Sequence, residues 1–119
     1  MTQERRDLGA RGEDLAADFF VKRGFRVIAK NWRCRAGEID LVVLKGVDLR
    51  VIEVKTRKSL GAGYPEEAVT NRKLDHMEAV IVDFLEHHPG LPEDVHFDVL
   101  AIVIAPTGVP SFRYIPDIE

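Results

Sequence analysis

Residues 38–55 have the sequence Glu-Ile-Asp-Leu-Val-Val-Leu-Lys-Gly-Val-Asp-Leu-Arg-Val-Ile-Glu-Val-Lys. Two runs rich in Val, Ile and Leu flank a short polar segment that contains glycine, a pattern typical of a β-hairpin. We expect Leu44 to pair with Leu49, and Val42 to pair with Val51. Side chains alternate between the two faces of a strand, so one face is expected to carry Ile39, Leu41, Val43, Ile52 and Val54. We expect the rest of the chain to be arranged around this hairpin.

Four charged side chains project from the other face of the predicted hairpin. The register places Asp40 opposite Glu53. It places Glu38 opposite Lys55. Like charges directly opposite each other destabilise a strand pair, so the two facing carboxylates predict a cation between them. Mg²⁺ binds carboxylate and backbone carbonyl oxygens, and the carbonyl of Val54 would complete such a set.

Lys55 lies two residues beyond Glu53 on the same face, where it would orient the attacking water or the phosphate. From the pattern alone an alternative stays open, namely a solvated surface hairpin whose Glu–Lys pair crosses the strands. In that case the charges would carry no chemistry.

The order of the charged residues is more specific than a generic charged hairpin. Gly-Glu-Ile-Asp at residues 37–40, followed by Glu-Val-Lys at residues 53–55, resembles the PD-(D/E)XK nuclease superfamily. The closer resemblance is to the YraN-type family of small bacterial proteins, whose Gly-Glu-Ile-Asp-Leu and Glu-Val-Lys-x-Arg patterns stand at 37–41 and 53–57. This similarity covers nearly the whole chain and extends to archaeal-type Holliday junction resolvases. Ile39 stands where the superfamily pattern has Pro.

The chain has 119 residues and 45% hydrophobic content, which predicts one compact domain over residues 1–119 with a sizeable core. It has no apolar run as long as a membrane span and no secretory signal pattern, so we expect a cytoplasmic protein that does not bind membranes. A single cysteine, Cys34, excludes an internal disulfide, and the four histidines lack zinc spacing.

The formal net charge of −3 is unevenly distributed along the chain. Residues 1–60 hold 14 Lys and Arg against 9 Asp and Glu, whereas residues 61–119 hold 3 against 11. The basic half therefore contains the hairpin. Phosphate binding requires a local basic surface, so a nucleic-acid partner is compatible with an acidic chain.

The hydrophobic periodicity and the turn residues predict the remaining elements. In chain order we expect a helix over 7–23, a strand over 25–28, a basic connection over 30–37, the hairpin, a Gly-bearing loop over 56–64, a helix over 65–88, a strand over 95–104 and an edge strand over 112–115. A helix that joins two strands implies that these strands are parallel. The resulting α/β order, α-β-β-β-α-β-β with a mixed sheet flanked by helices, resembles the restriction endonuclease-like core.

The first predicted helix contributes one further candidate. Glu13 lies on the flank of its apolar stripe and could point toward the hairpin. Archaeal-type resolvases bring a Glu of their first helix to the metal, so the resemblance implies that Glu13 is an additional ligand. Gly9 and Gly12 lower helix stability, which suggests a close approach of backbone or substrate.

Three cations are candidates for phosphate contacts, namely Arg33, Arg57 and Lys73. Arg33 lies in the basic connection, and Arg57 lies at the start of the loop after the hairpin. Lys73 interrupts the apolar stripe of the second helix and would either extend to the surface or contact a phosphate. Trp32 is expected to anchor its segment by packing.

Two classes of function follow. The first is a Mg²⁺- or Mn²⁺-dependent nuclease that hydrolyses DNA phosphodiester bonds, with selectivity for branched or structured DNA and a homodimeric state implied by the resemblance to resolvases. Its catalytic residues would be Asp40, Glu53 and Lys55, its metal ligands Asp40, Glu53, Val54 and Glu13, and its auxiliary residue Glu38. The alternative is a catalytically silent module that binds nucleic acid or protein on a nuclease fold.

Overall fold

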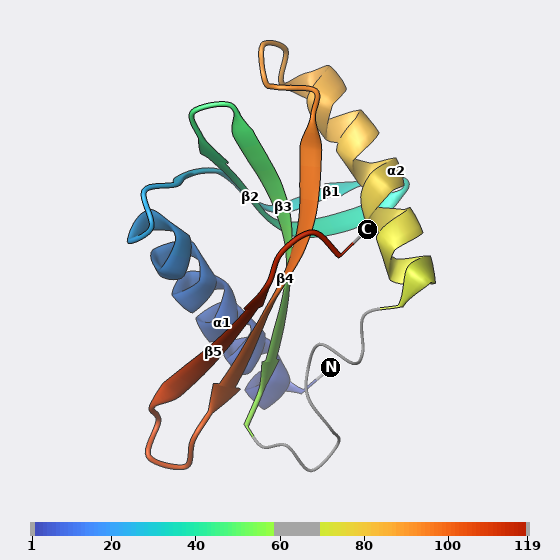
Figure 1. Cartoon of the computed structure of the whole chain (residues 1–119). Helices are drawn as coiled ribbons and strands as arrows, with labels where there is room; N and C mark the ends of the chain where they lie inside the picture. Colours follow the sequence, from blue (N-terminus) through green and yellow to red (C-terminus); the bar gives the residue numbers. More distant parts are fainter. Residues whose placement is uncertain (1, 59–69, 119) are drawn as a thin grey trace.

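The computed structural model describes residues 2–58 and 70–118, which form one five-stranded sheet with a helix on each face (Figure 1). In chain order the elements are α1 (Gln3–Val21), β1 (Arg26–Cys34), β2 (Gly37–Lys45), β3 (Asp48–Arg57), α2 (Asn71–His87), β4 (Val95–Ile104) and β5 (Pro110–Ile115). The predicted α/β class and the order α-β-β-β-α-β-β are confirmed.

The order of the strands in the sheet follows their order in the chain, from β1 at one edge to β5 at the other. The three strands β1, β2 and β3 are antiparallel neighbours, β3 and β4 are parallel, and β5 returns antiparallel to β4. The sheet is therefore mixed, as predicted. The strand over 95–104 has the predicted bounds, and six consecutive residues from Phe97 to Ile102 are buried because both faces of the sheet are covered.

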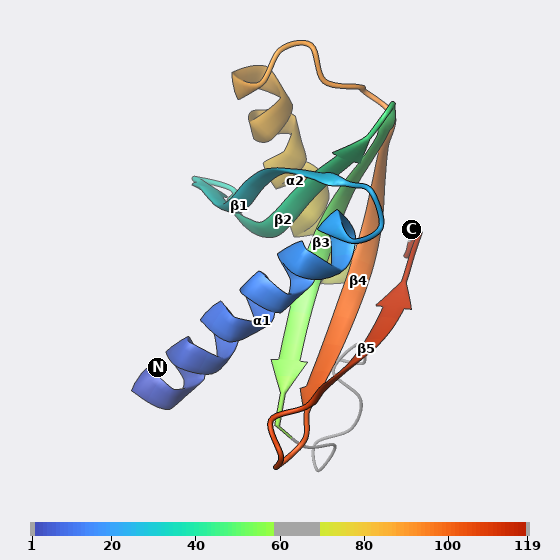
Figure 2. The ribbon, with the colours of Figure 1, turned by 90° about the vertical axis from the view of Figure 1, so that its left-hand side faces the viewer.

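The two helices cover opposite faces and enclose separate apolar layers (Figure 2). On the α1 side, Phe19 and Phe20 pack over Ile52 and neighbouring strand residues. On the α2 side, Phe84 packs over Val51 and the rest of the second layer. Of the helices in the described part of the chain, none is long and apolar enough to cross a membrane.

The turn end of the central hairpin has the predicted register, with Leu44 opposite Leu49 and Val42 opposite Val51. The ladder ends at the next pair, Leu41 and Ile52, so the predicted pairs Asp40–Glu53 and Glu38–Lys55 are wrong as backbone partners. Beyond Leu41, β2 stays paired with β1 and separates from β3. The turn sets the pairing only beside it, and farther along the Asp40 carboxylate accepts the backbone N–H of Val54, so a side chain stands where the next backbone pair would form.

The first strand is longer than predicted, because β1 includes most of the segment expected to be a basic connection. It changes faces at Asn31, which has a left-handed φ of 53°. Lys30 binds Asp14 on α1, whereas Trp32 packs edge-on against the ring of Phe84 on α2. The predicted role of Trp32 as a packing anchor is therefore confirmed.

The same change of faces occurs across the ladder in β2. Ile39 packs in the α2 layer and Leu41 in the α1 layer, so the prediction that they share a face is wrong. The period of two is interrupted at Asp40, which lies between Ile39 and Leu41, the partners of Trp32 and Lys30.

The second helix begins later than the expected residue 65. Thr70 is extended and caps the helix by accepting a hydrogen bond from the backbone N–H of Lys73. The predicted first turn at 65–67 and most of the predicted loop over 56–64 lie outside the described residues. The predicted apolar stripe is confirmed at its buried positions, Met77, Val80, Ile81 and Phe84.

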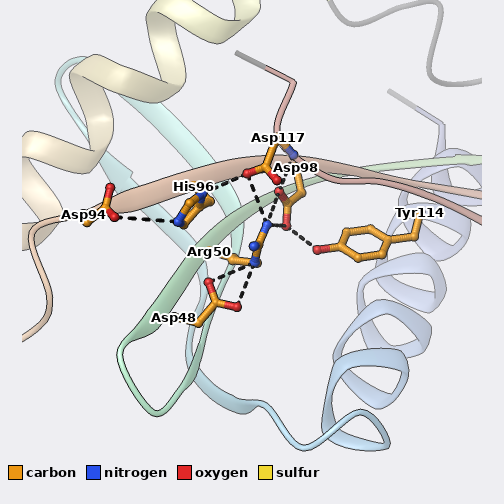
Figure 3. Close-up of polar contacts among 7 residues, drawn as sticks. All are labelled: Asp48, Arg50, Asp94, His96, Asp98, Tyr114 and Asp117. Atoms are coloured by element: carbon orange, nitrogen blue, oxygen red, sulfur yellow. Dashed lines mark hydrogen bonds and ion pairs between the residues drawn. The ribbon is translucent and has the colours of Figure 1, made fainter.

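A polar cluster ties β3, β4, β5 and the C-terminal segment together (Figure 3). Asp98 is fully buried and accepts hydrogen bonds from the guanidinium of Arg50 at 3.0 Å, from the hydroxyl of Tyr114 at 2.5 Å and from the backbone N–H of Asp117 at 2.9 Å. Burial and the Asp98 carboxylate raise the pKa of Tyr114, which keeps the hydroxyl protonated as a donor. The carboxylate of Asp98 therefore has hydrogen-bond donors from β3, β5 and the C-terminal segment, and the role of the cluster is structural.

Gly12 and Gly9 differ in what surrounds them, and this difference predicts opposite effects of alanine. A Cβ at Gly12 would overlap the Thr56 side chain, whose own Cβ would lie 2.9 Å away, whereas a Cβ at Gly9 would meet no atom within 4 Å. Gly12→Ala should lower the free energy of unfolding by about 1–3 kcal/mol. Gly9→Ala should raise it by about 0.5–1 kcal/mol, because alanine favours the helix. Urea unfolding measures both, and a Gly12→Ala protein as stable as Gly9→Ala would contradict the packing described.

Candidate active site

Asp40 lies at a cleft between α1 and the end of β3. The cleft has a volume of about 560 Å³ and is lined by Arg5, Leu8, Gly9, Glu13, Asp40 and residues 54–58. It brings the first helix, the second strand and the third strand to one place. Five predicted site residues line it, namely Glu13, Asp40, Val54, Lys55 and Arg57, whereas Glu53 is not among its lining residues.

The separation of β2 from β3 explains how Asp40 reaches this position. Where the ladder ends, the Asp40 carboxylate accepts the backbone N–H of Val54 at 2.8 Å. A side chain thus replaces the backbone acceptor that a continued ladder would have supplied. Because the N–H and C=O of one strand residue point to the same edge, the carbonyl of Val54 also faces the opening between the strands.

Glu53 is the second central carboxylate, and it is almost fully buried, with 3% of its surface exposed. Its Oε1 lies 3.3 Å from the ammonium of Lys55 and 3.2 Å from that of Lys73. One cation comes from the same strand and the other from α2. A buried carboxylate requires such partners, so Lys73 has a structural role in addition to its predicted phosphate contact.

Charge is concentrated around Asp40. Burial, followed by repulsion from Glu53, raises the pKa of Asp40 to about 7, while the Val54 N–H and Lys73 act in the opposite direction. Partial burial acts to lower the pKa of Lys73, but the combined attraction of Glu53 and neighbouring carboxylates outweighs it, and the pKa of Lys73 is raised. Asp40 and Glu53 are therefore close enough to repel each other although they are not ladder partners.

Glu13 belongs to the same constellation. Its Oε2 accepts a hydrogen bond of 2.6 Å from the side-chain amide of Asn31, the left-handed residue of β1. Its charge also contributes to the raised pKa of Asp40. The first helix thus presents a carboxylate to the cleft, and β1 fixes its orientation.

Three further predicted residues, Arg57, Arg33 and Glu38, lie around this centre. Arg57 lines the cleft. Arg33 and Glu38 form an exposed ion pair of 2.9 Å near the β1–β2 turn, beside a neighbouring hollow that Glu13 also lines. Phosphate contacts by Arg33, Arg57 and Lys73 stay predictions.

Sequence reasoning missed Asn31, Arg5 and Lys58. The sequence carries no signal for Asn31, because its role depends on a change of faces that only the paired strands reveal. Arg5 lay outside the predicted helix, which in fact begins at Gln3. A correct helix start would have placed it on the same helix as Glu13.

The resemblance implies a Mg²⁺ or Mn²⁺ ion, and the side chains at the cleft limit the kind of metal site that fits. Among residues 2–58 and 70–118, no group of three or more His, Cys, Asp or Glu side chains is arranged to hold a metal ion. A closed cage of side-chain ligands, as in structural zinc sites, does not fit this part of the chain. Mg²⁺ usually takes one or two carboxylates and keeps several waters, and it also binds substrate phosphates. Asp40 and Glu53 fit that mode.

The raised pKa of Asp40 predicts a pH dependence of stability. The folded protein holds this proton more tightly than the unfolded chain does, so the free energy of unfolding should fall as pH rises from 3.8 to about 7. Asp40→Asn should flatten this fall and raise the free energy of unfolding above pH 7 by about 1–3 kcal/mol without divalent ions. Urea unfolding across this pH range checks the effect, with the exposed Asp75→Asn on α2 as control. Parallel curves for Asp40→Asn and wild type would contradict it.

Comparison with known proteins identifies the family. Residues 12–102 match the model of the Uncharacterised protein family UPF0102. The chain is 41% identical over 109 residues to a UPF0102 protein of Renibacterium salmoninarum, and the match covers 92% of each chain. A UPF0102 protein of Clavibacter michiganensis subsp. michiganensis is 40% identical over 115 residues, 97% of each chain. One of Rhodococcus opacus is 42% identical over 110 residues, 92% of this chain and 93% of the relative. The predicted resemblance to the YraN-type family is confirmed, and the chain belongs to the UPF0102 family.

Proposed function

We propose that this protein is a Mg²⁺- or Mn²⁺-dependent nuclease that hydrolyses phosphodiester bonds of DNA. The observation that carries the proposal is the placement of Asp40 at a cleft with basic walls, where β2 leaves β3, with the buried carboxylate of Glu53 near enough to raise its pKa. Repulsion between the carboxylates favours a cation. The basic walls favour a polyanion.

The charges of the cleft divide into two sets. The cations Arg5, Lys55, Arg57 and Lys58 line its walls, and the carboxylates Glu13 and Asp40 line it as well. A module that only binds phosphate gains nothing from carboxylates that repel phosphate. A metal-dependent hydrolase needs both sets, because the carboxylates hold the ion and the cations hold the substrate.

Each residue then has a role that follows from its position. When bound, the ion would lower the pKa of a water and neutralise charge on the phosphate. Asp40 and Glu53 would hold it, with the Val54 carbonyl and Glu13 as further oxygen donors. The ammonium of Lys55, which lines the cleft and lies 3.3 Å from Glu53, would orient the attacking water or a phosphate oxygen.

One observation favours a second candidate, a silent module that binds nucleic acid or protein. Glu53 is already neutralised by Lys55 and Lys73, so half of the carboxylate pair is balanced without an ion. The two candidates differ in turnover. Incubation with Mg²⁺ or Mn²⁺ and a panel of single-stranded, duplex, flapped and four-way-junction DNA distinguishes them.

Metal binding should depend on Asp40. We expect Asp40→Asn to bind Mn²⁺ much more weakly than wild type, because the substitution removes a ligand charge and the repulsion that binding relieves. Calorimetric titration at neutral pH measures the affinity, and Asp75→Asn should match wild type. Equal Mn²⁺ affinities of Asp40→Asn and wild type would contradict the role of Asp40 as a metal ligand.

Lys55 should separate binding from chemistry. Lys55→Ala is expected to keep the fold and Mn²⁺ binding but to lose phosphodiester cleavage, since its ammonium would act on the reacting groups and not on the ion. Lys22→Ala is the matched control, because it removes an ammonium that binds Asp18 at 2.8 Å on α1. Single-turnover cleavage of the preferred panel substrate at saturating enzyme gives the rates. A wild-type rate for Lys55→Ala would mean that the catalytic lysine is misassigned.

A further inference from the structure

Two arginines on opposite walls of the cleft have no partner in the described part of the chain. Arg5 is exposed on α1, and Arg57 is half-buried at the end of β3. Within residues 2–58 and 70–118, neither guanidinium makes a hydrogen bond or an ion pair. Within the described residues, both guanidinium groups thus keep their hydrogen-bond donors for an external anion.

The other cations near the cleft are already engaged. Lys55 binds Glu53, and Lys58 binds Glu4 at 2.7 Å. Two of the cations predicted from the sequence to contact phosphate are engaged as well, Arg33 with Glu38 and Lys73 with Glu53. An anion that bound these four would have to compete with a carboxylate of the protein, whereas at Arg5 and Arg57 no carboxylate of residues 2–58 or 70–118 competes.

Both arginines lie away from the carboxylate centre. Arg5 precedes Glu13 by eight residues, which is about 12 Å along the axis of α1 at the usual rise. Arg57 follows Val54 by three residues, roughly 10 Å along β3. The backbone of each arginine is thus set back from the residues nearest Asp40, so the two guanidinium groups can contact phosphates other than the one that would react there.

The hollows beside the cleft leave room for such a molecule. A neighbouring hollow of about 260 Å³ shares Arg5, Gly9 and Glu13 with the cleft and extends toward the β1–β2 turn. Another, of about 380 Å³, shares Leu8 and Lys58 and extends along α1. Figure 2 shows the N-terminal half of α1 standing away from the end of β3, and side chains of both elements line the cleft.

We infer that Arg5 and Arg57 form a remote phosphate-binding pair that selects a DNA strand of several nucleotides over small phosphodiesters. The inference rests on the proposed function, because it takes the reacting phosphate to lie at Asp40. Guanidinium groups bind phosphate through two parallel hydrogen bonds, which gives each contact orientation as well as charge. Arg57 lies within residues 12–102, which the family model matches, whereas Arg5 precedes them.

Binding measured without cleavage tests the pair independently of turnover. Ca²⁺ replaces Mg²⁺, and fluorescence anisotropy follows single-stranded dinucleotide, tetranucleotide and octanucleotide DNA. Wild-type affinity should rise with length, and Arg5→Ala or Arg57→Ala should each lose roughly 10-fold for the octanucleotide and little for the dinucleotide. Each substitution should reduce the salt slope by about 0.7, the value for one phosphate of a single strand. Arg26→Ala, an exposed arginine on β1 that does not line the cleft, should resemble wild type.

The outcomes are separable. If Arg5→Ala and Arg57→Ala bind the octanucleotide as tightly as Arg26→Ala does, the pair is overturned. The proposed nuclease would still stand if wild type cleaves DNA with Mn²⁺. Equal losses for the dinucleotide and the octanucleotide would also overturn it, because the contacts would then be local to the reacting phosphate. Length-dependent losses without Mn²⁺-dependent cleavage would support the pair and leave only the silent binding module. No binding of any oligonucleotide would overturn both.

Discussion

The hydrogen bond between the Val54 N–H and the Asp40 carboxylate is the constraint on which the site depends. A strand edge that loses its neighbour must find another acceptor, and here the acceptor is an ionisable side chain instead of a backbone carbonyl. Because this side chain satisfies β3, the second strand is free to leave the ladder after Leu41. The opening that results is where Glu13 on α1 comes close to Asp40.

The arrangement of charges at this place costs stability. Asp40 is held near a second carboxylate, which raises its pKa to about 7, and Glu53 is kept buried by Lys55 and Lys73. An apolar pair at these two positions would avoid the burial of charge. The sheet elsewhere follows ordinary rules, with apolar layers on both faces and a buried Asp98 that has all its partners. The departure from those rules is local to the cleft, as expected for a functional site.

The sequence predicted those features that local pattern controls. The strand over 95–104 follows from a continuous apolar run, and the Leu44–Leu49 pair follows from the short turn beside it. The features it could not predict depend on contacts between distant segments. The end of the ladder at Leu41 goes with the bond from the Val54 N–H to the Asp40 carboxylate, and the face change at Asn31 goes with the contacts of Lys30 to α1 and of Trp32 to α2. Asp40 could be identified from its charge and spacing, but its bond to Val54 could not.

The face change in β1 also has a structural consequence. Within three residues the strand is attached to α1 through Lys30, to the cleft through the bond from Asn31 to Glu13, and to α2 through Trp32, whose indole N–H donates to Asp83 at 3.1 Å. The two helices lie on opposite sides of the sheet, yet three consecutive residues of β1 contact both of them. The residue that orients the Glu13 carboxylate at the cleft is therefore the direct neighbour of the residue that holds α2, so the two faces of the sheet meet in one short piece of backbone.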